Sequence, residues 1–195
     1  MPTIIDGSGS ATFQTPLPSL QGGTGITTFQ IPVPLAQGGT GATGYAKVLS
    51  TAKTDTFTTS SATYTDLTGL SVTITPQFAS SKILVSAQVN LGCNTAGARV
   101  ALQLLRGATA IGIGDTAGSR TRGTTAVQLS SPAGMNPASM EFLDSPATTL
   151  ATTYKVQLAS IDSVGAIFVN RTNNDDDAAS RSRTISTITV TEVFV

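Results

Sequence analysis

The stretch that decides the fold is Lys82-Ile83-Leu84-Val85-Ser86-Ala87-Gln88-Val89-Asn90-Leu91. It begins with consecutive apolar residues and then alternates between polar and apolar positions. Successive side chains of a β-strand point to opposite faces, so an alternation of period two places one face against a core. The stretch therefore predicts a long β-strand that is apolar on both faces near its start.

Similar segments lie on both sides of this strand. Residues 99–106 follow a short Asn-Thr-Ala-Gly turn, and we expect them to form a hairpin with residues 82–91. Residues 70–75 alternate strictly, and residues 185–195 alternate threonines with larger side chains. Shorter candidate strands lie at 109–113, 124–130, 139–144, 153–160 and 165–170. Roughly eight strands joined by turns predict an all-β fold, a jelly-roll-like β-sandwich, for a head domain of residues 46–195.

The composition favours the same fold class. Threonine is β-branched and prefers strands, and it supplies 33 of the 195 residues. The good helix formers Glu and Lys are rare, while 19 glycines mark many turns.

Residues 1–45 follow a different pattern, because they contain a tandem repeat. The run Thr-Phe-Gln-Thr-Pro-Leu-Pro-Ser-Leu-Gln-Gly-Gly-Thr-Gly at 12–25 recurs at 28–41 as Thr-Phe-Gln-Ile-Pro-Val-Pro-Leu-Ala-Gln-Gly-Gly-Thr-Gly. Ten of the fourteen aligned positions are identical. The Gly-rich half is not a phosphate-binding loop, because it lacks the Lys-Ser/Thr pair that such a loop requires.

This segment is expected to be an extended attachment arm. Its prolines fix φ and remove backbone donors, and its glycines permit close approach of another backbone. The expected attachment positions are Pro16, Pro18, Gly22, Gly23, Gly25, Pro32, Pro34, Gly38, Gly39 and Gly41. The segment carries too little apolar surface to offset the entropy of ordering itself, so we expect neighbouring chains to order it. A flexible linker is the alternative.

Charge and residue usage exclude several classes of function. The formal net charge is zero and charged residues make up 11% of the chain, against about 25% in an average domain. The sequence shows no cluster of basic residues that would bind nucleic acid and no apolar run that would span a membrane. It also shows no signal peptide, so we expect assembly in a host cytoplasm. The scarcity of charge also suggests a surface that is covered by Ser, Thr, Asn and Gln, or one that is hidden in an oligomer.

Histidine is absent, so no Ser-His-Asp or Cys-His arrangement exists within the chain. Cys93 is the only cysteine, which excludes an intrachain disulfide or a cysteine-based metal site; we expect it to be buried. We therefore expect no catalytic residue, no cofactor and no metal. Four carboxylates are expected to be solvated side chains in or near turns: Asp115, Glu141, Asp144 and Asp162.

Two loops carry weaker signals. The acidic run Asn173–Asp177 is expected to be a hydrated loop tip, with calcium binding as the alternative, and nearby arginines could pair with it: Arg171, Arg181 and Arg183. The basic segment Gly118–Gly123 is expected to be an exposed loop, and contact with an anionic glycan or a partner chain is the alternative.

The run Gln-Gly-Gly-Thr-Gly-Ala-Thr-Gly at 37–44, preceded by Pro-Leu-Ala, resembles a repeat of bacteriophage tail fibres. The opening Ile-Ile-Asp-Gly-Ser-Gly-Ser and the segments at 82–85 and 104–107 are also similar to small phage fibre proteins. The resemblance implies a homotrimer with an N-terminal attachment tract, a C-terminal head and recognition of a host surface, often a glycan. Because the chain leaves little length for a shaft, a place on the capsid is also open.

Two functions follow as hypotheses for a protein of the virion. The first is a trimeric tail fibre that is attached to another phage structural protein by residues 1–45 and contacts the host with residues 46–195. The second is a trimeric capsid decoration protein, anchored on the capsid by the same arm. An enzyme such as a depolymerase is a third, weaker alternative.

Overall fold

The computed structural model describes residues 4–5, 11–12, 47–162 and 165–195. The chain divides into two units, Met1–Tyr45 and Ala46–Val195. In the first unit, β1 (Ile4–Ile5) pairs with β2 (Ala11–Thr12) in an antiparallel ladder. All ten expected attachment positions, from Pro16 to Gly41, lie outside the described residues, so the extended arm stays a prediction.

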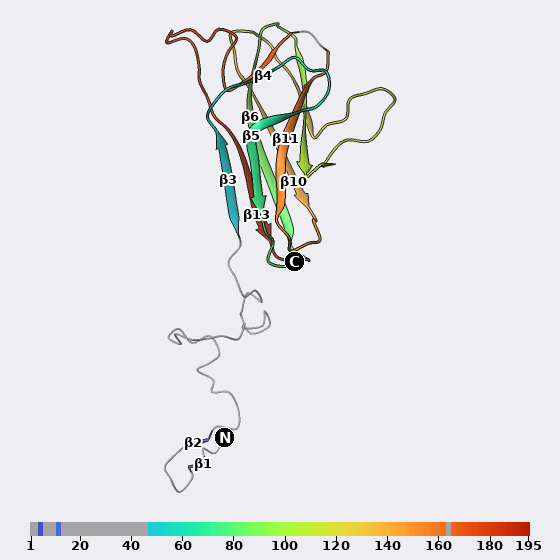
Figure 1. Ribbon diagram of the computed structural model, residues 1–195, viewed down its shortest axis with the longest axis vertical. Helices are drawn as coiled ribbons and strands as arrows, with labels where there is room; N and C mark the ends of the chain where they lie inside the picture. The colour runs from blue at the N-terminus through green and yellow to red at the C-terminus, as the bar shows by residue number, and fades with distance from the viewer. Residues whose placement is uncertain (1–3, 6–10, 13–46, 163–164) are drawn as a thin grey trace. The chain divides into compact units, whose positions relative to one another are not determined.

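The second unit consists of two antiparallel sheets (Figure 1). The six-stranded sheet has the order β3 (Val48–Lys53), β13 (Ser186–Val193), β6 (Lys82–Cys93), β12 (Ile167–Val169) and β4 (Phe57–Thr59), with β10 (Asn136–Asp144) also paired to β6. The five-stranded sheet has the order β5 (Thr65–Ile74), β11 (Thr152–Ser160), β7 (Arg99–Arg106) and β8 (Thr109–Ile111), with β9 (Thr125–Gln128) also paired to β7.

The core lies between the two sheets and follows the alternation of the sequence. Alternate residues of β6 are fully buried, among them Ile83, Val85 and Val89. From β5 to β7, and again from β9 to β11, consecutive strands change sheet, as in the Greek-key connections of a jelly roll. The predicted all-β sandwich is confirmed. Among the described residues there is no helix, and so none that could cross a bilayer.

The predicted hairpin between residues 82–91 and 99–106 is wrong. β6 pairs with β10, β12 and β13, whereas β7 pairs with β8, β9 and β11. The connection crosses from one sheet to the other. Its Asn94 N–H bonds to the carbonyl of Ala166 beside β12, and its Gly97 N–H bonds to the carbonyl of Leu129 beside β9. The two strands face each other through side chains, so a short turn between alternating runs did not identify the partner.

Two strands were not expected from the sequence, and a third begins earlier than expected. β3 and β4 precede the first expected strand, and β5 begins at Thr65 rather than at residue 70. β3 is an edge strand and most of its residues are exposed, so the sequence Val-Leu-Ser-Thr-Ala-Lys shows no alternation. Its place is fixed by six register pairs with β13.

The sandwich has two ends that differ in character. The arm end is the one at which β3 begins and β13 finishes; it includes Lys47, the connections 75–81 and 145–151, and residues 194–195. The loop end lies at the other extreme of the strands and includes the connections 54–56 and 60–64 on either side of β4, and the connections 94–98, 129–135 and 170–185. Figure 1 shows the long connections at one extreme and the C-terminus at the other.

Candidate interaction surfaces

Exposed apolar side chains gather at the arm end. Among the described residues seven large apolar side chains are exposed, and only Ile185 lies at the loop end. The other six lie in the arm end or on the strand residues next to it: Val48, Leu49, Phe78, Leu143, Leu150 and Val195. Leu150 and Val195 are the most exposed, at 74% and 69%. Single exposed apolar residues are normal and would be spread over both ends. A cluster of them at one end indicates a surface that contacts another molecule.

Buried polar groups hold this end in shape. Glu192 is 1% exposed, and its Oε1 accepts a 2.6 Å hydrogen bond from the backbone N–H of Gln77. That bond fixes the connection 75–81, from which the Phe78 ring contacts Phe194 edge-on at a centroid distance of 5.6 Å. Phe78 is thus held at the surface by a buried carboxylate, which makes the apolar end a preformed feature.

A second polar cluster joins the two sheets near the same end. Arg106 Nη1 donates to both oxygens of Asp144, at 2.9 and 3.0 Å, and Tyr154 Oη donates to Asp144 Oδ2 at 2.7 Å. Burial raises the pKa of Tyr154, and the hydrogen bond to the Asp144 carboxylate raises it further. The expectation that Asp144 is solvated is wrong: it is 5% exposed, because β10 turns this residue toward the core side of the sheet.

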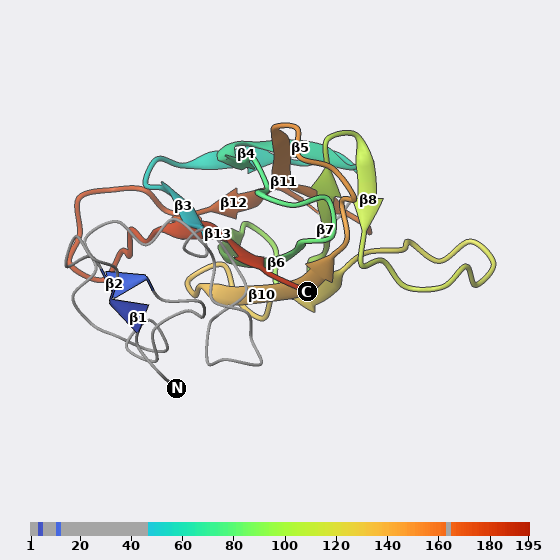
Figure 2. The same ribbon diagram turned by 90° about the horizontal axis from the view of Figure 1, so that it is seen from below.

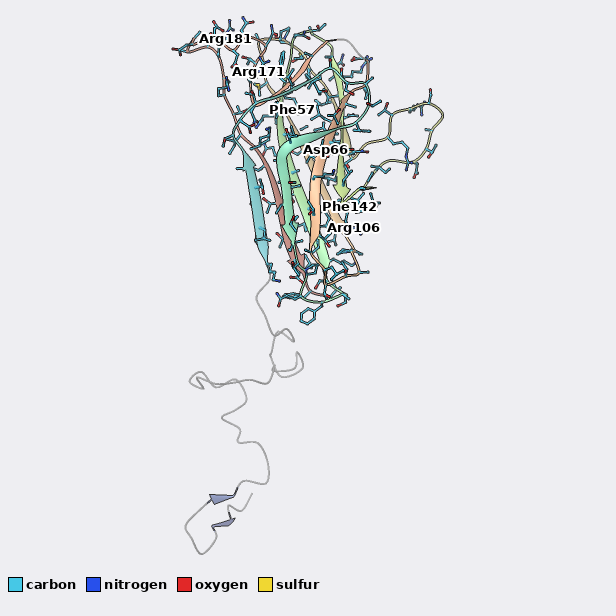
Figure 3. All side chains as sticks on the ribbon, in the orientation of Figure 1. Phe57, Asp66, Arg106, Phe142, Arg171 and Arg181 are labelled. Carbon is cyan, nitrogen blue, oxygen red and sulfur yellow. The ribbon has the colours of Figure 1, made fainter. Side chains whose placement is uncertain are left out.

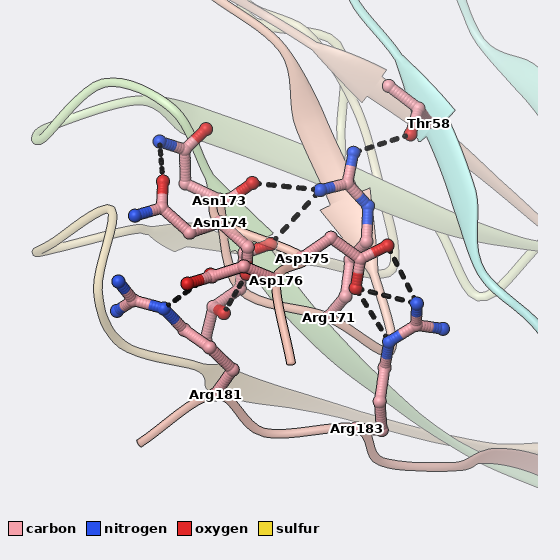
Figure 4. A network of polar contacts seen from close by, with 9 residues as sticks. Thr58, Arg171, Asn173, Asn174, Asp175, Asp176, Arg181 and Arg183 are labelled. Atoms are coloured by element: carbon pink, nitrogen blue, oxygen red, sulfur yellow. Dashed lines mark hydrogen bonds and ion pairs between the residues drawn. The ribbon is translucent and has the colours of Figure 1, made fainter. Parts of the chain in front are cut away.

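The acidic run at the loop end is paired with arginines of its own chain (Figure 4). Arg183 donates to both oxygens of Asp175 at 2.7 Å, and Arg181 Nε donates to Asp176 Oδ1 at 2.9 Å. The hydrogen bond from Arg181 lowers the pKa of Asp176. The pairing that the sequence suggested is present for Arg181 and Arg183, though not for Arg171, and it neutralises two of the three consecutive carboxylates.

Arg171 anchors the start of this loop. Its Nη1 donates to the carbonyls of Thr172 and Asn173 at 3.2 and 2.9 Å, and its guanidinium lies over the Phe168 ring at 3.8 Å. Figure 3 shows Arg171 and Arg181 at the loop end, well separated from Arg106. Within the described part of the chain, no three acidic or cysteine side chains gather in a way that could hold a metal ion.

The remaining carboxylates and the cysteine are dispersed. Asp115 lies in the connection between β8 and β9, Glu141 is exposed on β10, and Asp162 accepts a 3.0 Å hydrogen bond from the Arg99 N–H. Cys93 is fully buried, as expected, and burial raises the pKa of its thiol. The structure does not bring these groups together into one site.

The outer face of the six-stranded sheet carries a shallow polar groove. The register aligns Gln88 with Ser139 and Thr187, and aligns Ser86 with Glu141 and Thr189. These six side chains, with Ala87 and Met140 beneath them, line a groove of about 400 Å³. The next row toward the arm end is apolar apart from one threonine: Val48, Thr191, Leu84 and Leu143. The residues of the groove and of this row come from strands that are far apart in the sequence, so the sequence alone did not predict either feature.

A finger of residues 113–123 projects from the edge of the five-stranded sheet between β8 and β9 (Figure 2, yellow-green). Its base is closed by the bond from Gly114 N–H to the Gly123 carbonyl at 3.2 Å and by Arg122 Nε to the Gly114 carbonyl at 2.6 Å. Tyr64 Oη donates to the Arg122 carbonyl at 2.6 Å. Residues 114–122 are all exposed, as expected for the basic loop 118–123 within this finger.

No family model matches the chain, and no curated protein sequence matches it. The solved structures that are similar in part include two of infectious bursal disease virus. The Gx strain structure has a TM-score of 0.39 at 13% identity over 78% of this chain, and the Gt strain structure has a TM-score of 0.38 at 12% identity over 87%. The chain spans 38% and 50% of the lengths of those two chains.

Proposed function

We propose that the protein is a structural component of a bacteriophage particle, a short homotrimeric tail fibre. Residues 1–45 attach it to another phage structural protein, and residues 46–195 form the head that contacts the host surface, with a surface glycan as the ligand class. The proposal rests on the repeat of residues 12–41, whose sequence resembles repeats of phage fibres. It rests also on the difference in exposed apolar side chains between the two ends of the head.

The observation that carries the proposal is the unequal exposure of the two ends. Among the described residues, six of the seven exposed large apolar side chains lie in or next to the arm end, where the chain continues into residues 1–46. The loop end instead carries paired charges and amide side chains, among them Asn173, Asp175 and Arg183. An apolar end suits permanent burial against partner proteins, while a hydrated polar end suits reversible contact.

The trimer is supported by the outer face of the six-stranded sheet. The row of Val48, Leu84 and Leu143 leaves Val48 60% and Leu143 44% exposed in a single chain. Such a row across a whole sheet face loses hydrophobic stabilisation unless another subunit covers it. Three identical heads would also strengthen weak host contacts through avidity.

A pair of variants tests the attachment role. Leu150→Asp combined with Val195→Asp adds charge to the arm end, and Ile185→Asp adds it at the loop end, where Ile185 is 52% exposed. We expect both proteins to fold, and only the arm-end variant to be depleted from purified particles. Deleting residues 1–45 should likewise leave a folded head that is not incorporated. Incorporation of the truncated protein at the normal level would overturn the attachment role.

A capsid decoration protein is the second candidate, because the exposed apolar side chains of the arm end suit burial on a capsid as well as on a tail. In that case the same arm anchors a trimeric knob on the capsid. Quantitative mass spectrometry of particles separates the two: copy number in proportion to the major capsid protein supports decoration, and a few copies per tail support a fibre. We propose no catalytic role, so incubation with host capsular polysaccharide should release no oligosaccharide.

A further inference from the structure

We propose that the finger of each subunit lies in the outer-face groove of the next subunit, with Arg120 of one chain paired to Glu141 of its neighbour. This inference rests on the proposed homotrimer and names the contact that closes it. The partner is therefore a second copy of this chain, and not a host or capsid component.

The finger is held firmly at its base although its tip packs on nothing in its own chain. Tyr64 and the Gly114–Gly123 bond fix the base, and both flanking glycines are closely packed. A Cβ on Gly112 would meet the Phe142 ring at 2.7 Å, and one on Gly123 would meet the Leu102 carbonyl at 2.8 Å. A loop without a partner gains nothing from such a base, because exposed loops are ordinarily mobile and loosely packed.

Arg120 lies at the tip of this finger and is the unpaired cation there. The described residues form five ion pairs, none of which includes Arg120, and Arg122 is occupied at the base by the Gly114 carbonyl. Charged residues make up only 11% of the chain, so an exposed and unpaired guanidinium on a projecting loop indicates a contact with another molecule. It offers five N–H donors in a planar fork.

The groove offers the matching acceptors. Glu141 is the single charged residue of its lining, it is exposed, and it belongs to none of the five ion pairs. Ser86 Oγ donates to Glu141 Oε2 at 2.9 Å and so orients the carboxylate. Gln88, Ser139 and Thr189 also line the groove, and their hydroxyl and amide oxygens are further acceptors there. An arginine inserted here would meet one opposite charge on a floor of neutral acceptors.

The contact allows identical subunits to follow one another around a ring. The finger leaves an edge of the five-stranded sheet, and the groove lies on the outer face of the other sheet, so a finger-in-groove contact joins two different surfaces. Heterologous contacts of this kind close into cyclic oligomers when the rotation permits, and a three-fold ring is the smallest common one beyond the dimer. A hairpin with five residues on each side reaches about 15 Å, which is enough to cross part of a neighbouring sheet.

Charge reversal provides the first test, on the full chain. Arg120→Glu and Glu141→Arg should each raise the concentration at which the trimer dissociates by about tenfold or more, because each places two like charges in the contact. The double variant, Arg120→Glu with Glu141→Arg, should restore the wild-type value. Arg99→Glu is the control, since it makes the same charge change at an exposed residue of β7 in the other sheet that belongs to none of the five ion pairs, and it should leave dissociation unchanged. Sedimentation velocity over a dilution series measures all four.

A disulfide test reports the contact directly. Because the only native cysteine, Cys93, is fully buried, the variant with Arg120→Cys and Glu141→Cys should form covalent trimers on mild oxidation, and each single variant should stay monomeric in denaturing gels. A wild-type trimer that is unaffected by charge reversal and does not crosslink would overturn the finger contact and leave the proposed trimer standing. A monomeric wild type at micromolar concentration would overturn both.

Discussion

Tyr154 Oη donates a 2.7 Å hydrogen bond to Asp144 Oδ2 and so joins β11 of the five-stranded sheet to β10 of the six-stranded sheet. The tyrosine is fully buried, and Arg106 of β7 binds the same carboxylate through both oxygens. Hydrogen bonds of a buried ionised group are stronger than neutral ones, so this cluster fixes how the two sheets meet near the arm end.

Tyr154→Phe should destabilise the head by about 1–3 kcal/mol, because the Asp144 oxygen loses a donor where water does not replace it. Tyr64→Phe is the matched control: its hydroxyl bonds to the neutral Arg122 carbonyl in an exposed setting, so its loss should loosen the base of the finger and cost the head less stability than the loss of the buried bond. Urea unfolding, followed by far-ultraviolet circular dichroism, measures the free energy of unfolding of both variants. Equal losses for the two variants would contradict the special role of the Asp144 cluster.

The raised pKa of Tyr154 predicts a loss of stability in alkali. The folded protein keeps this phenol protonated where the unfolded chain ionises, so the stability it contributes is complete below pH 10 and falls as the pH rises above that. The slope approaches about 1.4 kcal/mol per pH unit for one such group. Tyr154→Phe should flatten the pH dependence of the unfolding free energy between pH 10 and 11.5. An unchanged slope in that variant would assign the effect to another group.

The sequence predicts which residues face the core far better than it predicts which strands pair. The run at 153–159 alternates, and β11 buries Tyr154, Val156 and Leu158 as that pattern requires. Period two reports the face of a strand, whereas the partner is set by connections that only the folded chain reveals. That is why the hairpin of residues 82–106 was wrong, although both of its strands were right.

The candidate surfaces were less predictable for a related reason. The groove combines side chains of β6, β10 and β13, which are separated by some 50 residues at each step, and its members read in sequence as ordinary polar positions of strands. The finger was visible only as a basic loop, because the hydroxyl that pins it comes from Tyr64. By contrast, Asp175 and Asp176 pair with arginines eight and five residues away, respectively, and so these pairs could be expected from the sequence.

Asn170 is predicted to be the most sensitive polar residue of the loop end. It is fully buried with φ of +63°, and its Nδ2 donates to the carbonyls of Lys53 and Asp55 at 2.8 and 2.9 Å. Asn170→Gly keeps the left-handed backbone and loses these bonds, at about 2–3 kcal/mol; Asn170→Ala adds about 1 kcal/mol of backbone strain. Thermal unfolding orders the three proteins, and an alanine variant as stable as the glycine variant would refute the strain.

The lowered pKa of Asp176 gives a prediction for the acidic loop. Its carboxylate contributes to the order of the loop above pH 3.8, and that contribution is lost as the pH falls through the lower, folded value. Carbon-detected NMR titration should place the Asp176 midpoint below 3.8, and Arg181→Gln should return it toward that value. A midpoint that does not move in Arg181→Gln would show that the bond between the two side chains does not persist in solution.

Gly112 and Gly118 form a matched pair for testing the base of the finger. Both have a left-handed backbone, with φ of +59° and +58°, so an alanine costs about 1–2 kcal/mol of strain at either position. A Cβ on Gly118 meets nothing within 4 Å, whereas one on Gly112 meets the Phe142 ring at 2.7 Å. Gly112→Ala should therefore lose about 1–3 kcal/mol more than Gly118→Ala, because Phe142 must leave its rotamer or the finger must shift. Urea unfolding measures this difference in the free energy of unfolding.

A trimer of Gly112→Ala that dissociates more readily than that of Gly118→Ala would show that the angle of the finger matters for the contact between subunits. Equal stability of the two variants would mean that the finger base yields freely, which would remove the rigidity on which the finger contact depends.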